Sequence, residues 1–192
     1  MKLQKRIIIG ISGASGAIYG IRALELLKPL EIETHLIISN AAKITIHEET
    51  DYKLDEIKAL ADVIHPANDI AACISSGSYQ TAGMLVAPCS MRTLAEIASG
   101  VTSSLMSRAA DVILKERRRL VLMARETPFT TIHIDNMQRV TQAGGIIYPP
   151  VPAYYQKPES IDDIVNQTVS RALELFDLDT GKVTRWKDNT GK

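Results

Sequence analysis

Short apolar runs alternate along the chain with longer amphipathic segments. The runs that predict strands lie at residues 6–9, 34–39, 63–65, 83–87, 120–124 and 146–148. The segments that predict helices lie at residues 17–27, 40–48, 90–99, 105–117, 131–143 and 160–176. Because strands and helices alternate, the sequence predicts parallel strands joined by right-handed crossovers. The predicted fold class is α/β, a three-layer, doubly wound, mostly parallel sheet of the Rossmann-like type.

Length and charge narrow the class of protein. The 192 residues suit one domain, and no repeat or low-complexity segment divides them. We therefore expect a single domain over residues 1–192, with a tail from about residue 177 that packs on a neighbouring subunit. Lys and Arg together number 22, as do Asp and Glu, so no overall charge attracts nucleic acid or a membrane. No apolar run reaches membrane-spanning length, and we expect a cytoplasmic location.

The cysteines and histidines show no metal-binding spacing. Cys73 and Cys89 form no CxxC pair, and the four histidines form no HxxxH or HExxH motif. The sequence therefore predicts neither a zinc site nor a disulfide framework.

The first candidate site is the glycine-rich segment GISGASG at residues 10–16, between a predicted strand and a predicted helix. Glycines let the backbone approach a ligand closely, and the helix start offers N–H groups to an anion. The spacing is not the GxGxxG of dinucleotide folds, and the absence of GK[ST] argues against Walker-type nucleotide binding. An ordinary tight turn is the alternative, but three glycines and two serines favour a ligand.

Two further strands end in hydroxyl side chains. Ser90 stands at a predicted N-cap with Thr93 one turn later, and Ser39 ends the second predicted strand. Such groups suit a phosphate, although helix capping alone is the simpler explanation at each position. Ligands bind at the carboxyl ends of strands in doubly wound sheets, so we expect these segments along one edge.

A basic series follows later in the chain. It comprises Arg108, Lys115, Arg117, Arg118, Arg119 and Arg125. Arg108 and Lys115 are seven residues apart and share a helical face, whereas Arg125 directly follows a strand. Residues 117–119 resemble a solvated surface run.

Three other residues are candidates with open alternatives. Glu126 is an acid or base candidate if its pKa is shifted, and otherwise a salt-bridge partner of a neighbouring arginine. Tyr155 and Arg171 suit either a phosphate or a subunit interface, and spacing alone favours the interface.

These segments, in this order, resemble the UbiX flavin prenyltransferase family. The matching residues are 10–16, 39, 48–51, 87–93, 108–112, 114–118, 125–126, 128–129, 132–133, 136–137 and 155. The resemblance implies a flavoprotein fold that binds reduced FMN and dimethylallyl phosphate, joins the prenyl group to N5 and C6 of the flavin, and uses no metal. It also implies a homo-oligomer, often a dodecamer, and a UbiD-type phenolic acid decarboxylase that receives the prenylated FMN.

The resemblance also assigns residue roles. Contacts with FMN are implied for Gly13, Ala14, Ser15, Ser39, Ser90, Met91, Arg92, Thr93 and Arg125. Contacts with the prenyl phosphate are implied for Arg108, Lys115, Arg125, Tyr155 and Arg171. Ser15, Glu49 and Glu126 are the implied catalytic residues, which handle protons near the flavin. We expect Tyr155 and Arg171 to come from a neighbouring subunit.

The chain departs from many family members at Ser104, where Asn is common, and at Ala124, where Pro is common. Two related functions stay open, namely an FMN-dependent flavoprotein that decarboxylates a cysteine and a non-catalytic flavin carrier. The basic series, together with Tyr155 and Arg171, favours a second substrate that carries a phosphate. Prenylation of FMN is therefore the predicted function.

Overall fold

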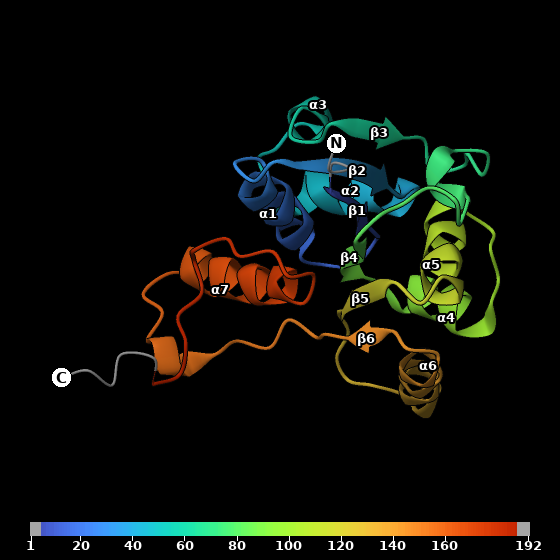
Figure 1. Cartoon of the computed structure of the whole chain (residues 1–192). Coiled ribbons are helices and arrows are strands. Elements are labelled where there is room, and N and C mark those ends of the chain that lie inside the picture. Colours follow the sequence, from blue (N-terminus) through green and yellow to red (C-terminus); the bar gives the residue numbers. More distant parts are fainter. Residues whose placement is uncertain (1–4, 188–192) are drawn as a thin grey trace.

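The computed structural model describes residues 5–187. Its centre is a six-stranded sheet in the order β3-β2-β1-β4-β5-β6, in which every neighbouring pair of strands is parallel (Figure 1). The strands are β1 (Lys5–Ile11), β2 (Ile32–Ile38), β3 (Val63–His65), β4 (Gly83–Cys89), β5 (Arg119–Ala124) and β6 (Ile146–Ile147). The doubly wound α/β prediction is confirmed.

Helices connect the strands and cover both faces of the sheet (Figure 1). They are α1 (Ala17–Leu27), α2 (Asn40–Glu49), α3 (Leu54–Lys58), α4 (Met91–Ser99), α5 (Leu105–Lys115), α6 (Thr131–Gln142) and α7 (Ile161–Glu174), with short 3-10 helices η1 (Cys73–Ser75) and η2 (Tyr154–Gln156). One hydrophobic core joins α1, α2, α3 and α7 to one face of the sheet. A second core joins α4, α5 and α6 to the opposite face.

The central strand β1 belongs to both cores. Ile7, Ile9 and Ile11 contribute to the first core, and Ile8 contributes to the second. Side chains alternate between the two faces of a strand, so a strand covered on both faces carries a continuous apolar run. This burial explains the unbroken III sequence at residues 7–9.

The observed boundaries differ from the predicted ones by one or two residues at the ends of both strands and helices. α5 ends at Lys115 rather than at residue 117, and Arg117 takes a left-handed backbone conformation with φ 56°. The apolar pattern does not predict α3, which has a single buried residue, Ile57, and therefore no repeat of apolar positions. Among the helices of residues 5–187, none is long and apolar enough to cross a membrane.

The described part of the C-terminal tail follows α7 of its own chain. Thr184 N–H donates to Gln167 Oε1 (2.9 Å), and Thr180 Oγ1 donates to Ser170 Oγ (2.8 Å). The packing of this tail on a neighbouring subunit stays a prediction.

Candidate functional site

The glycine-rich turn at residues 12–16 joins β1 to α1 at the carboxyl edge of the sheet. A Cβ on Gly13 would lie 2.3 Å from the Cβ of Ala41 in α2, so only glycine permits this close approach. Gly16 has φ 101°, a left-handed conformation that also favours glycine. Local packing therefore requires glycine at both positions, whether or not a ligand is bound.

Glu49, at the end of α2, holds the end of this turn. Its Oε2 accepts hydrogen bonds from the N–H groups of Gly16 (2.7 Å) and Ala17 (3.4 Å). A carboxylate at a helix N-terminus also interacts favourably with the helix dipole. The prediction that the start of α1 offers free N–H groups to an anion is therefore wrong for Gly16 and Ala17. The implied catalytic role of Glu49 stays a prediction.

Ser12 links the turn to β4, at the point where the strand order reverses. Its Oγ donates to Pro88 O (2.9 Å) and accepts from the N–H of Ser90 (2.7 Å), and the residue is buried. In doubly wound sheets the crevice at this reversal is the usual ligand site. The sequence prediction omits Ser12, and its place within the glycine-rich segment is the only signal for it.

A pocket of about 480 Å³ opens beside the turn, between the starts of α2 and α4. Its lining includes five of the predicted FMN residues, Gly13, Ser39, Ser90, Arg92 and Thr93. Ser39 Oγ accepts from Ala42 N–H (3.1 Å), and Ser90 Oγ accepts from Thr93 N–H (3.2 Å). Both serines are therefore helix N-caps, as the simpler explanation held, and both also face one pocket.

The same pocket contains polar groups that the sequence prediction omits, among them Lys43 and Asn68. Lys43 lies one helical turn after Ser39, and its Nζ donates to Asn40 Oδ1 (3.0 Å). Ser104 also lines the pocket and caps α5 by accepting from Ser107 N–H (3.3 Å). Asn is an equally good N-cap, so this departure from the family leaves the helix start intact.

A second pocket, of about 510 Å³, shares the glycine-rich turn with the first. Ser15, Arg125 and Glu126 line it together with Tyr19 and Phe129. Burial raises the pKa of the Tyr19 hydroxyl, and the positive charge of Arg125 opposes this rise. The guanidinium of Arg125 therefore supplies positive charge at this pocket, next to a carboxylate and two hydroxyls.

The end of β5 fixes Arg125 and leaves Glu126 available. Arg125 N–H donates to Cys89 O (3.1 Å), and the buried Ala124 pairs with Cys89 in the sheet. The backbone of Arg125 is therefore held in place although Ala124 stands where many family members have proline. Glu126 Oε1 accepts only from the N–H of Thr127 (3.0 Å), and within residues 5–187 it forms no ion pair. The salt-bridge alternative for Glu126 therefore finds no partner within the described part of one chain, and the acid or base role of Glu126 stays a prediction.

The rest of the basic series has other partners. Arg118 donates to Tyr79 O (2.7 Å) and to Gly77 O (2.6 Å), and its side chain is 12% exposed. Arg119 pairs with Asp177 (3.1 Å). The interpretation of residues 117–119 as a solvated run is therefore wrong for Arg118, which holds the loop before β4, whereas Arg119 is exposed and pairs with a residue that follows α7.

Lys115 lies far from Arg125 within one chain. It ends α5, where it pairs with Glu116, and the chain then enters β5 at its amino end. β5 has six residues and Arg125 follows its carboxyl end, so the strand separates the two cations by roughly 20 Å. Arg108, in the first half of α5, pairs with Asp111 (3.0 Å). A single chain therefore does not bring Lys115 and Arg125 to one phosphate.

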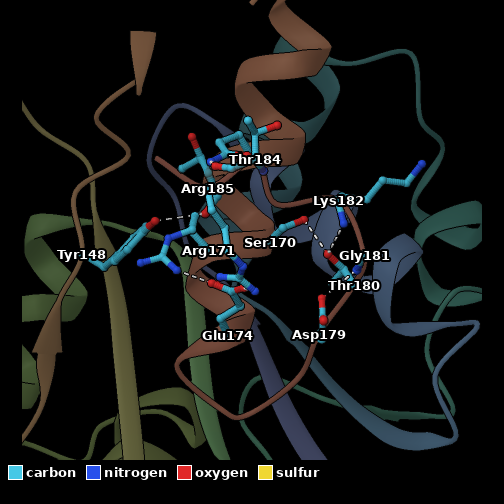
Figure 2. A network of polar contacts seen from close by, with 12 residues as sticks. Tyr148, Ser170, Arg171, Glu174, Asp179, Thr180, Gly181, Lys182, Thr184 and Arg185 are labelled. Atoms are coloured by element: carbon cyan, nitrogen blue, oxygen red, sulfur yellow. Dashed lines mark hydrogen bonds and ion pairs between the residues drawn. The ribbon is translucent and has the colours of Figure 1, made fainter. Parts of the chain in front are cut away.

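Tyr155 and Arg171 belong to a third region, around α7. Figure 2 shows Arg171 beside Glu174 and Arg185. Arg171 and Arg185 both pair with Glu174, the latter at 2.6 Å. Tyr155 OH donates to Thr184 O (3.2 Å). Glu174 is absent from the sequence prediction, although its position three residues after Arg171 is a signal for the pair.

The carboxyl edge thus assembles eight of the predicted site residues into two adjacent pockets. These are Gly13, Ser15, Ser39, Ser90, Arg92, Thr93, Arg125 and Glu126. Ala14 and Met91 belong to the same turn and helix start but line neither pocket, and Glu49 lies beneath the turn. Arg108, Lys115, Tyr155 and Arg171 lie outside both pockets.

Comparison with known proteins identifies the class of this fold and site. The Flavoprotein family model matches residues 1–173. The flavin prenyltransferase UbiX of Neisseria meningitidis serogroup B is 57% identical over 185 residues, which cover 96% of this chain and 98% of that protein. The chain therefore belongs to the UbiX flavin prenyltransferase family.

Solved structures agree with this assignment. AnUbiX (PadA1) in complex with FMN and dimethylallyl pyrophosphate is 55% identical, with a TM-score of 0.94 over 96% of this chain and 98% of that one. A dodecameric FMN-dependent UbiX-like decarboxylase from Escherichia coli O157:H7 is 48% identical, with a TM-score of 0.93 over 95% and 99%. The peptidyl-cysteine decarboxylase EpiD shares the fold, with a TM-score of 0.66, but only 15% of the sequence over 92% of this chain and 100% of that one.

Proposed function

We propose that this protein is a flavin prenyltransferase that joins the dimethylallyl group of dimethylallyl phosphate to N5 and C6 of reduced FMN. The observation that carries the proposal is the 57% identity to a flavin prenyltransferase over nearly the full length of both chains. The relative that binds FMN and dimethylallyl pyrophosphate supports the choice of both substrates. The convergence of Ser15, Arg125 and Glu126 on one pocket supports it further.

The first pocket has the groups that FMN requires. Its volume of about 480 Å³ lies in the range of small-molecule sites. Ser39, Ser90 and Thr93 offer hydroxyls and helix starts to a phosphate, and Lys43 adds a positive charge. Gly13 keeps the backbone close to α2, where a Cβ would not fit. These residues would hold the phosphate end of FMN.

The second pocket has the groups that the transfer requires. When bound, reduced FMN supplies the nucleophilic atoms N5 and C6. Dimethylallyl phosphate loses its prenyl group as the C–O bond breaks, and the phosphate leaves with the electron pair. Arg125 compensates that charge. Glu126 is the free carboxylate nearest Arg125 in sequence, and it accepts or returns a proton during closure of the new ring.

The remaining phosphate ligands come from other subunits in this proposal. Lys115 and Arg125 lie at opposite ends of β5, and α5 and α7 cover opposite faces of the sheet. Arg125, Lys115 and Arg171 can therefore reach one phosphate only if more than one chain contributes. The dodecameric relative supports an assembly of this kind.

The test is incubation with reduced FMN and dimethylallyl phosphate, followed by mass analysis of the flavin. The proposal predicts a flavin heavier by one dimethylallyl group, without EDTA sensitivity. A parallel reaction with dimethylallyl pyrophosphate asks which prenyl donor is used. An unchanged flavin mass with both donors would contradict the proposal and favour a flavin carrier. Oxidation of a cysteine peptide instead would favour the EpiD-like activity.

The product is proposed to serve a UbiD-type phenolic acid decarboxylase in the cytoplasm. Adding the reaction product to a cofactor-free decarboxylase of this type should restore its activity, and FMN alone should not.

A further inference from the structure

Two buried histidines and an exposed cysteine meet at the outer edge of the sheet, away from the glycine-rich turn. His35 lies in β2, His65 ends β3, and Cys73 begins η1. Their ligand atoms all lie within 4.8 Å of one another. His35 Nδ1 is 2.9 Å from His65 Nε2, and the two rings are stacked with centroids 5.2 Å apart. The sequence spacing hides this group, because three separate segments supply its members.

A carboxylate fixes the proton on one imidazole. His35 Nε2 lies 2.8 Å from Glu33 Oε1. A carboxylate only accepts, so Nε2 carries the proton and Nδ1 presents its lone pair toward His65 and Cys73. A ligating histidine in a metalloprotein is usually held in this way, by a carboxylate on the ring nitrogen that does not touch the metal.

Glu33 is itself held as an anion. Arg6 Nε donates to it (2.9 Å), and so does Tyr79 OH (3.1 Å). Burial alone would raise the pKa of Glu33, but hydrogen bonds from His35, Tyr79 and Arg6 lower it. Burial and the nearby His35 lower the pKa of His65, and Asp69 opposes this shift. Glu33 is therefore a charged acceptor for the Nε2–H group of His35.

We infer that His35, His65 and Cys73 form a binding site for zinc. Two imidazole nitrogens and one thiolate are a ligand set that zinc prefers, and Glu33 is the carboxylate behind the first ligand. A water molecule completes the four-coordinate shell. On binding, the Cys73 thiol loses its proton to solvent, and the His65 proton moves from Nε2 to Nδ1.

The distances are close to those that zinc needs. With Zn–N near 2.0–2.1 Å and Zn–S near 2.3 Å in a tetrahedron, the two nitrogens stand about 3.3 Å apart and each lies about 3.6 Å from the sulfur. The observed N–N distance is 2.9 Å, so the two nitrogens need to separate by about 0.4 Å, and the rings need to turn until both lone pairs point at the ion. Cys73 is exposed on the short helix η1, so it is the ligand that adjusts.

Such an ion would anchor η1 to the edge strand. The chain between β3 and η1 includes Pro66, Ala67 and Asn68, which line the first pocket, and Ala67 O accepts from the N–H of Leu105 (2.9 Å). The ion would therefore stabilise one wall of that pocket without touching FMN.

The experiment is a cobalt titration of the chelator-treated full-length protein. Tetrahedral cobalt bound by a thiolate gives intense visible bands and a thiolate charge-transfer band in the near ultraviolet. We expect both to saturate at one cobalt per chain and to disappear on addition of zinc. Cys73→Ser should lose the charge-transfer band, whereas His47→Asn, which changes an exposed histidine outside the group, should behave as the wild type.

A second measurement is the melting temperature with zinc. At free zinc about 100-fold above its dissociation constant, the wild type should melt about 5–10 °C higher, and Cys73→Ser should shift little. Retention of the charge-transfer band in Cys73→Ser, or no saturable binding in the wild type, would overturn the assignment. Cys73→Ser should keep its FMN stoichiometry, so a failed zinc site leaves the proposed function untouched.

Discussion

The turn after β1 and the region around Arg171 are held together in opposite ways. The turn is fixed by hydrogen bonds from one chain, through Ser12 and Glu49, and it lies between two formed pockets. Arg171 instead pairs with the carboxylate of Glu174, which it shares with Arg185, and faces no pocket of the carboxyl edge (Figure 2). We therefore expect one chain to supply the flavin half of the site, which is the pair of pockets beside the turn. We expect the prenyl phosphate half, which adds Lys115, Tyr155 and Arg171, to need residues of neighbouring chains.

The largest expected effect in the flavin half comes from Glu126→Gln. The variant keeps the shape of the side chain and removes its basicity, so product formation should slow by about 10²- to 10⁴-fold. FMN binding should stay near the wild-type value, because Glu126 lines the second pocket and not the first. Glu48→Gln, an exposed neighbour of Glu49 on α2, is the matched control. Wild-type turnover by the Glu126 variant across about pH 5 to 9 would remove Glu126 from the chemistry.

In the other half, Arg171→Ala tests the phosphate contact. Losing one hydrogen bond to a charged group costs about 1.5–3 kcal/mol, which is roughly 10- to 150-fold in affinity. The dissociation constant of dimethylallyl phosphate should rise by that factor, and that of FMN should not change. Arg139→Ala, an exposed arginine on α6, is the control. Equal loss of FMN affinity would mean that the two halves are not separate.

Ser12→Ala should loosen the turn with a smaller effect. It leaves the Ser90 N–H without its acceptor, whereas the Pro88 carbonyl keeps the hydrogen bond from the backbone N–H of residue 12 (3.2 Å). The expected cost is about 1–3 kcal/mol in the free energy of unfolding. Because the pocket between α2 and α4 depends on this link, FMN affinity should fall together with stability. Ser99→Ala, at an exposed helix end, should change neither. Thermal unfolding and flavin fluorescence titration measure the two quantities.

EDTA treatment should leave the flavin half unchanged. Within residues 5–187 no group of three metal-ligating side chains lines either pocket, since the one such group is formed by His35, His65 and Cys73. FMN should therefore bind at one per chain before and after chelation. A loss of flavin on chelation would connect the zinc group to the flavin site.

The sequence predicts the flavin half better than the phosphate half for a physical reason. Strand ends follow apolar runs, so Ser39, Ser90 and Arg125 could be placed on one edge from the pattern alone. The partners of Arg118 depend on a contact between segments that are far apart along the chain. The pairing of Arg171 with Glu174 has a signal in the helical spacing, but that spacing does not show whether Arg171 also contacts a phosphate. Helical spacing correctly put Arg108 and Lys115 on one helix but carried no information on which edge of the sheet Lys115 occupies.

The most direct test of a site divided between chains is activity in mixed oligomers. One chain carries Lys115→Ala and the other Arg171→Ala, and each variant is expected to be nearly inactive alone at dimethylallyl phosphate concentrations well below its raised dissociation constant. In one chain these residues lie on helices that cover opposite faces of the sheet, so a shared site draws them from different chains. We predict that mixing and reassembly restore part of the prenyltransferase activity, because some interfaces combine an intact Lys115 with an intact Arg171. Mixtures that assemble fully and stay as inactive as the separate variants would contradict the divided site.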